Sequence, residues 1–266
     1  MEGNRKFVYK NFLSRFLSSI VLMLAALYFN SLGGYYFFFL TIIISIVLLI
    51  ELYHLFSKQC LQAYFLLNLF FNFLLLISIF YNFYYIFLIV FFLSIGIKPL
   101  IYKVNNYPFI IAEVYITLPI CAFLNLNGSL EGKSIIHWVF LVVWTVDISG
   151  YVFGNLFKGP KLISHVSPNK TWSGFISGIL LAGILSIFFA YYIKNESYLA
   201  YFIISVVAGL FCTAGDLFES YLKRKNNIKD TSNLIPGHGG LLDRLDGFLF
   251  AILFFWIVAY FKEHFI

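Results

Sequence analysis

Residues 220–246 read SYLKRKNNIKDTSNLIPGHGGLLDRLD, and this polar stretch lies between two strongly apolar segments, 198–221 and 242–261. Ionisable side chains beside a membrane span are costly, and their default interpretation is a functional site whose charges have partners or bind an ion. The flanking segments are each long enough to cross a bilayer core of about 30 Å. The stretch therefore predicts a polar site at one end of two membrane-spanning helices.

The rest of the chain has the same apolar character. Hydrophobic residues make up 61% of its 266 residues and charged residues 11%, which excludes an ordinary soluble domain. Apolar segments of roughly 17 to 25 residues suit a membrane span. We expect an all-α, polytopic integral membrane protein with about nine transmembrane helices in one domain, 1–266, at 16–32, 35–56, 60–79, 82–97, 107–126, 134–154, 172–194, 198–221 and 242–261.

Two of the span boundaries depend on few polar residues. The first and second spans are separated by the sequence NSLGG at 30–34, where paired glycines after a polar pair predict a turn. The third and fourth spans are separated only by Asn82 in a run of Phe and Tyr, so a re-entrant pair is an alternative there.

Lys and Arg are distributed unevenly among the predicted loops. If nine spans alternate, fifteen of the 18 basic residues fall on one side, and only Lys133, Lys194 and Lys262 fall on the other. Cytoplasmic loops carry the excess of Lys and Arg. We therefore expect the N-terminus and the 223–240 loop in the cytoplasm and the C-terminus outside. Topology also accounts for most of the +6 net charge, and without an extended soluble basic surface nucleic acid is not an expected partner.

One helical face at the end of the eighth span is entirely polar, because Asp216, Glu219, Ser220 and Lys223 have the spacing i, i+3, i+4 and i+7. We interpret this face as a wall of a cytoplasm-facing cavity in which Asp216 is a metal ligand. An ion pair between Glu219 and Lys223 is the structural alternative for those two residues.

The turn Pro236-Gly-His-Gly-Gly240 leads into the ninth span. Glycines allow a close backbone approach, and we expect unpaired N–H groups at the helix N-terminus to bind a phosphate. One helical turn apart in the ninth span, Asp243 and Asp246 suit Mg²⁺, which takes one or two carboxylates and substrate phosphates. The alternative is an internal ion-pair network with Arg244 or Lys223.

The fixed polar positions of this region carry a resemblance. The pattern Ser220-x-Leu-Lys-Arg224, then Lys229-Asp230, then the glycine turn and Asp243-Arg-Leu-Asp246 resembles the C-terminal motif of phosphatidate cytidylyltransferases, also called CDP-diacylglycerol synthases. The resemblance implies Asp216 and Asp243 as metal ligands for Mg²⁺, with room for a second, monovalent cation. It further implies Lys223, Arg224 and Asp246 as catalytic residues and the following substrate-binding residues: Ser220, Lys229, His238, Gly239, Gly240 and Arg244.

A second polar block runs from Asp147 to Asn155 and from Ser164 to Gly174, and it is similar to the other motif of that family. By this resemblance Ser167, Lys170 and Thr171 contact phosphate or nucleotide, while Pro168 suits the entry of the seventh span. The chain has Ser173 where the family commonly shows Glu, and Asn169 where a second Lys is frequent. The alternative is a helix-capping loop whose lysines serve topology alone.

The resemblance implies an enzyme that condenses CTP with phosphatidic acid, releases pyrophosphate and leaves CDP-diacylglycerol in the membrane, with its catalytic region mainly at 144–250. We expect it in the bacterial inner membrane with the active site facing the cytoplasm and membrane lipids around it. A homodimer is compatible with the family. The alternatives are a CTP-dependent kinase of a polyprenol-type lipid and a transporter, which would carry its carboxylates near the bilayer midplane.

Other polar and sulfur-containing residues have structural interpretations. Cys60, Cys121 and Cys212 are too scattered for a disulfide framework or a thiolate metal site, and we interpret them as small apolar fillers. We also expect structural roles for Glu51, His54 and Glu113.

Overall fold

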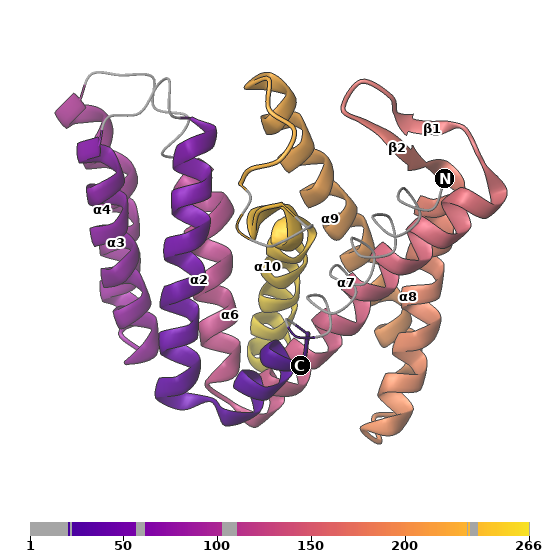
Figure 1. The fold of residues 1–266 in the computed structure, drawn as a ribbon. Helices are drawn as coiled ribbons and strands as arrows, with labels where there is room; N and C mark the ends of the chain where they lie inside the picture. The colour runs from indigo at the N-terminus through magenta and orange to yellow at the C-terminus, as the bar shows by residue number, and fades with distance from the viewer. Residues whose placement is uncertain are drawn as a thin grey trace. The chain divides into compact units, whose positions relative to one another are not determined.

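The protein is almost entirely helical (Figure 1). The structure, a computed structural model, describes residues 21, 23–56, 62–102, 111–232, 234 and 239–265. These form two compact units, 1–117 with 226–245 and 118–225 with 246–266. After an apolar helix at Met23–Leu32, the elements are α2 (Gly34–Leu55), α3 (Gln62–Phe80), α4 (Tyr84–Tyr102), the π-helix η1 (Ala112–Thr117), α6 (Leu118–Asn127), α7 (Leu130–Phe157), β1 (Lys161–Ile163), β2 (Ser167–Thr171), α8 (Trp172–Tyr192), α9 (Tyr198–Lys225) and α10 (Leu242–Phe265).

The apolar helices confirm the expected fold class. Among the described residues, five are long and apolar enough to cross a membrane: Gly34–Leu55, Leu130–Phe157, Trp172–Tyr192, Tyr198–Lys225 and Leu242–Lys262. Four shorter apolar helices are Met23–Leu32, Phe65–Phe80, Tyr84–Gly96 and Ala112–Asn127. Each of the nine overlaps one predicted span. The protein is therefore a polytopic, helical membrane protein, and the single-domain assignment remains a prediction.

The two span boundaries that depend on few polar residues, at 30–34 and at Asn82, are turns in the first unit. Gly33 and Gly34 have positive φ angles of 64° and 54°, a conformation that glycine adopts without the clash of a Cβ. Asn82, with φ 59°, takes the same left-handed conformation between α3 and α4, where the amide of Phe83 donates to the carbonyl of Ser78 at 2.7 Å. Asparagine tolerates this region better than most residues. The predicted turn at 30–34 is confirmed, and a turn also lies at the predicted boundary at Asn82, where the choice between two spans and a re-entrant pair remains a prediction.

A buried amide holds the helices of the first unit together. The side chain of Asn72 on α3 accepts a hydrogen bond from Ser45 of α2 and donates one to Thr117 of η1, both at 3.0 Å. In an apolar environment, a polar group that is paired in this way avoids the cost of an unmet hydrogen bond. The network therefore aligns α2, α3 and η1 with one another.

Small residues set the packing of the second unit. A Cβ on Gly174 of α8 would lie 2.4 Å from the carbonyl oxygen of Gly150 on α7, so the two helices approach more closely than any other residue would allow. Farther along these helices, the indole of Trp138 on α7 donates to Ser186 of α8 at 2.9 Å and to Ser205 of α9 at 2.8 Å. These contacts fix α7, α8 and α9 side by side (Figure 1).

A short antiparallel hairpin, β1 and β2, connects α7 to α8, with Lys161 opposite Thr171. It is a local exception to the all-α expectation. Pro168 lies within β2, and α8 begins only at Trp172, so the placement of Pro168 at the entry of the span was wrong. Thr171 caps α8 by accepting a hydrogen bond from the amide of Gly174 at 3.2 Å. The hairpin therefore ends in a helix cap.

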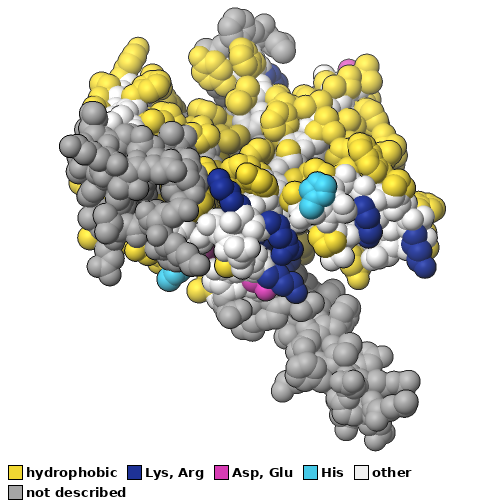
Figure 2. All heavy atoms as spheres, turned by 90° about the horizontal axis from the view of Figure 1, so that it is seen from above, with side chains coloured by type: hydrophobic (Ala, Val, Ile, Leu, Met, Phe, Trp, Pro, Cys, Tyr) yellow, Lys and Arg dark blue, Asp and Glu magenta, His cyan; other side chains and the backbone are white. Residues whose placement is uncertain are grey.

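The basic residues of the second unit separate between its two ends. Lys262 pairs with Glu131 at the start of α7, which places it at the end opposite the hairpin. Figure 2 looks onto the hairpin end, where Lys and Arg side chains lie among polar atoms. The described members of this unit at that end are Lys158, Lys161, Lys170, Lys223, Arg224 and Lys225. Six basic residues thus lie at the hairpin end of this unit and Lys262 at the opposite end, while the distribution of Lys and Arg across the membrane remains a prediction.

Candidate functional site

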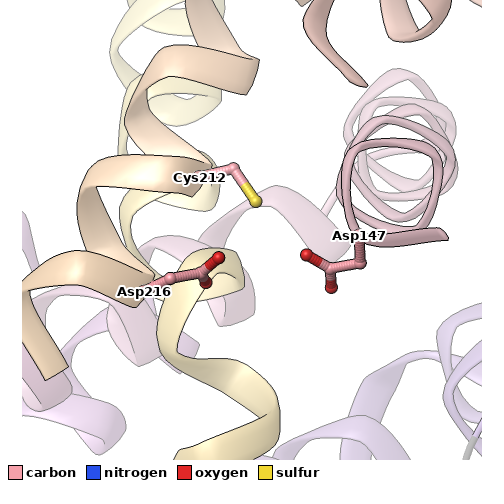
Figure 3. Close-up of side chains that lie close together, drawn as sticks. All are labelled: Asp147, Cys212 and Asp216. Atoms are coloured by element: carbon pink, nitrogen blue, oxygen red, sulfur yellow. The ribbon is translucent and has the colours of Figure 1, made fainter. Parts of the chain in front are cut away.

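Two carboxylates and a thiol lie close together in the second unit. Asp147 of α7 and Asp216 and Cys212 of α9 each bring one potential ligand atom within 4.8 Å of the other two. Figure 3 shows the two carboxyl groups turned toward each other with the sulfur beside them. Asp147 is exposed and Asp216 half-buried, whereas Cys212 is buried. Two like charges at this separation favour a bound cation.

Close packing of α9 against α10 supports this carboxylate cluster. A Cβ on Gly247 would lie 2.5 Å from an oxygen of Asp216 and 2.7 Å from the sulfur of Cys212. A Cβ on Gly215 would lie 2.4 Å from the carbonyl oxygen of Asp246. Because only glycine fits at both positions, α10 presses directly against the turn of α9 that carries Asp216. The orientation of that side chain is therefore restricted by the helix contact.

Lys170 supplies a cation to the cluster. It extends from β2 and forms a hydrogen-bonded ion pair with Asp216. Burial lowers the pKa of Lys170, but the charge of Asp216 and the hydrogen bond to it raise it more. The charges of Asp246 and Asp147 add to that rise, so the pKa lies above its usual value. The ammonium group is consequently charged at neutral pH.

The basic residues predicted at the end of α9 have partners in the same unit. Lys223 pairs with the buried Glu219 at 2.6 Å, which confirms the ion pair considered as an alternative for these two residues. Arg224 is exposed, and its Nε donates to the carbonyl of Val166 in the hairpin at 3.5 Å. Both side chains are thus held near the hairpin end of the unit, and their catalytic role remains a prediction.

In the first unit, Asp243 is anchored by the segment that precedes it. Its Oδ2 accepts hydrogen bonds from the amide and hydroxyl of Thr231, at 3.0 and 2.9 Å, and from the amide of Gly240 at 2.8 Å. The amides of Leu241 and Leu242 donate to the carboxylate of Glu51 at 2.9 and 2.6 Å. The expectation of unpaired N–H groups at the start of α10 is therefore wrong for these three amides, because carboxylates of the chain bind them.

The remaining predicted site residues lie in α9, α10, the hairpin and the segment before α10. Asp246 follows Asp243 in α10, and its Oδ1 accepts from the amide of Gly247 at 2.8 Å. Gly239 has a positive φ of 84°, which requires glycine. The remaining ones are Ser167 in β2, Ser220 in α9, and the exposed Lys229 and Arg244. His238 lies outside the described residues. Asp216 and Asp243 belong to different units, and their joint ligation of one ion remains a prediction.

The positions that depart from the family pattern have local roles. Ser173 accepts a hydrogen bond from the amide of Gly159 at 3.3 Å and lies 3.1 Å from the hydroxyl of Thr171. It ties the start of the hairpin to the first turn of α8. Asn169 is exposed in β2. Thr171 is buried and forms the N-cap of α8. Its contact with a substrate remains a prediction.

Two members of the carboxylate cluster were not selected from the sequence. Asp147 was recognised within the second polar block without being named as a ligand, and Cys212 was interpreted as an apolar filler. A usable signal existed for each. An aspartate inside an apolar span is expensive and marks a functional position, and Cys212 is at i−4 from Asp216 on the same helical face.

The donor atoms of this cluster fit a hard divalent cation. Carboxylate oxygens are the ligands that Mg²⁺ prefers, whereas a thiol suits softer metals. Asp216 already binds a cationic group, the ammonium of Lys170, which demonstrates that its oxygens are accessible to positive charge. Asp147 and Asp216 are therefore the residues of this unit that would hold Mg²⁺.

Comparisons with known proteins agree with the motifs. A sequence model described as "Cytidylyltransferase family" matches residues 13–261. A phosphatidate cytidylyltransferase of Rickettsia felis is 40% identical over 157 residues, covering 55% of this chain and 68% of the relative. One of Rickettsia prowazekii is 40% identical over 169 residues (60% and 73%). One of Haemophilus influenzae is 38% identical over 130 residues (47% and 45%).

Proposed function

The chain belongs to the cytidylyltransferase family, and we propose that it transfers the cytidylyl group of CTP to phosphatidic acid with release of pyrophosphate. The observation that carries this proposal is the pair of neighbouring carboxylates, Asp147 and Asp216, with the ammonium of Lys170 bound to Asp216. It lies in a chain whose relatives are named phosphatidate cytidylyltransferase. The negative carboxylates suit the metal cation, and the positive ammonium suits the phosphate groups of CTP.

In this reaction a phosphate oxygen of phosphatidic acid forms a bond to the α-phosphorus of CTP. The bond from that phosphorus to the oxygen bridging the α- and β-phosphates breaks, and its electron pair leaves with pyrophosphate. The nucleophile is already an anion, so positioning and charge neutralisation are needed more than a strong base. Bound Mg²⁺ would supply part of that neutralisation.

The chain's own residues contribute orientation and charge. Asp147 and Asp216 would hold the metal, and the family motif proposes Asp243 as a further metal ligand. Lys170 carries an ammonium group beside Asp216, and we propose that this charge also attracts a phosphate oxygen of the substrate. Glu219 holds Lys223 in place by the ion pair, so that this cation remains at the hairpin end of α9.

The orientation of the site follows from the charge distribution. The basic residues at the hairpin end favour the cytoplasmic side, where CTP is available. Members of the cluster lie at that same end of the unit, since Lys170 extends directly from β2. We therefore propose a bacterial inner-membrane enzyme whose active site faces the cytoplasm.

The test uses purified protein, phosphatidic acid, Mg²⁺ and CTP carrying label either in the cytidine or in the γ-phosphate. Cytidine label should enter the lipid phase only with phosphatidic acid and Mg²⁺ present, and excess EDTA should stop it. Entry of the γ-phosphate into an alcohol lipid would refute the proposal in favour of a lipid kinase.

A pair of matched variants connects this test to the cluster. Lys170→Met should lower cytidylyl transfer strongly, because it removes the cation beside Asp216. Lys262→Met also removes one partner of an ion pair, with Glu131, at the opposite end of the same unit. That control should keep activity near wild type, and an equal loss in both variants would contradict the site.

A further inference from the structure

Glu51 is a buried carboxylate near the end of an apolar helix, α2, and it is only 2% exposed. Its Oε1 accepts hydrogen bonds from the hydroxyl of Ser232 at 2.6 Å and from the amide of Leu241 at 2.9 Å. Its Oε2 accepts from the amide of Leu242 at 2.6 Å and lies 3.4 Å from the hydroxyl of Thr231. Both oxygens are thus engaged by a segment about 180 residues away in the chain.

The carboxylate occupies the N-terminus of α10. The first amides of a helix have no partners within the helix, and the helix dipole favours negative charge there. A Cβ on Gly240 would lie 2.8 Å from both carboxylate oxygens of Glu51 and 2.0 Å from the hydroxyl of Thr231. The absence of a side chain at Gly240 therefore allows this close approach, and Glu51 takes the place of an external anion.

The same segment sets the direction of Asp243. Thr231 contacts both carboxylates, since its hydroxyl lies 2.9 Å from Oδ2 of Asp243 and 3.4 Å from Glu51. The amide of Gly240 provides a third hydrogen bond to the same Oδ2. Three donors on one oxygen fix the plane of the carboxyl group and thereby the direction of Oδ1. Glu51 accepts hydrogen bonds from Ser232, Leu241 and Leu242, the residues that directly follow these donors in the chain.

We infer that Glu51 is a positioning residue for Asp243: it holds Thr231, Ser232, Leu241 and Leu242 against α2 so that Asp243 presents Oδ1 in one fixed direction. This inference rests on the proposed function, in which Asp243 is a metal ligand. It differs from a general packing role, because the hydrogen bonds of Glu51 go to the segment that orients Asp243.

Glu51→Gln tests this role with nearly unchanged volume. Glutamine has one acceptor oxygen, and its amide nitrogen would face an N–H donor, so at least one of the amides of Leu241 and Leu242 loses its acceptor. Ser45→Ala is the matched control. Ser45 is a buried polar residue of the same helix, but its side chain bonds to Asn72 and Ile42 and not to any residue that Glu51 binds.

The first readout does not depend on activity. Amide hydrogen exchange, followed by mass spectrometry on peptides containing 239–245, should be at least about ten times faster in Glu51→Gln than in wild type or Ser45→Ala, since lost hydrogen bonds permit local opening. The second readout is the Mg²⁺ concentration for half-maximal cytidylyl transfer. It should rise at least about tenfold in Glu51→Gln, because a misdirected ligand weakens metal binding and misplaces the site by a fraction of an ångström.

Thr231→Val provides a second variant if Glu51→Gln fails to fold, because it removes only the hydroxyl between the two carboxylates. It should raise the Mg²⁺ requirement in the same direction. Two results for Glu51→Gln would overturn the positioning role. One is faster amide hydrogen exchange with an unchanged Mg²⁺ requirement, and the other is unchanged amide hydrogen exchange. If wild-type protein failed to transfer cytidylyl label, the proposed function would fail. The exchange measurement would still decide whether Glu51 clamps the segment.

Discussion

Replacing Gly247 by alanine should inactivate the enzyme more than it destabilises it. The new Cβ would lie 2.5 Å from an oxygen of Asp216, 2.7 Å from the sulfur of Cys212 and 3.0 Å from the backbone oxygen of Cys212. Ordinary contacts between such atoms are about 3.5 Å, so Asp216 must shift by roughly 1 Å. A displacement of this size in a catalytic group costs on the order of 100-fold in rate.

The change in stability is expected to be smaller. Overpacking costs about 1–3 kcal/mol, while alanine is favoured over glycine in a helix by about 1 kcal/mol. The net destabilisation is therefore about 0–2 kcal/mol, which leaves folded protein for the assay. Turnover of cytidine-labelled CTP into lipid should fall about 100-fold, and thermal unfolding in detergent should report the small change in stability.

Gly150→Ala is the control for this prediction. Gly150 is on α7 in the same unit, one turn beyond Asp147, and a Cβ there would lie 3.6 Å from the carbonyl oxygen of Gly174, an ordinary contact. Activity should remain within a few-fold of wild type. Full activity in Gly247→Ala, or an equal loss in Gly150→Ala, would refute the claim that helix packing orients Asp216.

Three further predictions follow from the charges. Asp216→Asn and Asp243→Asn should each lower turnover at least ~100-fold, since a lost metal ligand removes several kcal/mol of charge stabilisation, and high activity in folded protein of either variant would contradict its assignment. The raised pKa of Lys170 means that its pair with Asp216 stabilises the fold at neutral pH and loses this effect only as pH rises above the usual lysine value of 10.5. The difference in Tm between wild type and Lys170→Met should therefore stay constant across neutral pH, and a decline near pH ~7 would refute this sign. In a cysteine-free background, an impermeant maleimide applied to intact cells should label a cysteine at His264 but not at Asn227, and labelling at Asn227 would invalidate the cytoplasmic orientation.

The amino-acid sequence alone determined the membrane class, the approximate spans and the family. A long apolar segment in a bilayer has few structures open to it other than a helix, because its backbone polar groups must be hydrogen-bonded within the segment. Local turn chemistry was also readable, since Gly33 and Gly34 and the isolated Asn82 adopt the left-handed conformations that end helices. These features depend on residues close together in the chain.

The hairpin was not predicted, because its strands are too short to show an alternation of apolar and polar residues. Pro168 instead indicated the start of a helix. The pairing of Glu219 with Lys223 was foreseen as an alternative because i,i+4 spacing is a local property of one helix. Lys170 and Asp216 were both predicted as site residues, but their ion pair was not predicted, because they lie 46 residues apart in the chain.

Only the tertiary structure decided which charged groups meet. Asp147, Asp216 and Lys170 come from three separate elements, and glycine contacts between helices bring them to one place. Glu51 likewise reaches the start of α10 from α2, where its carboxylate pairs the amides that the sequence suggested were open to phosphate. Hydrophobic periodicity specifies that a helix forms, but the partner of a buried charge is set by helix packing, which brings residues far apart in the chain within hydrogen-bonding distance.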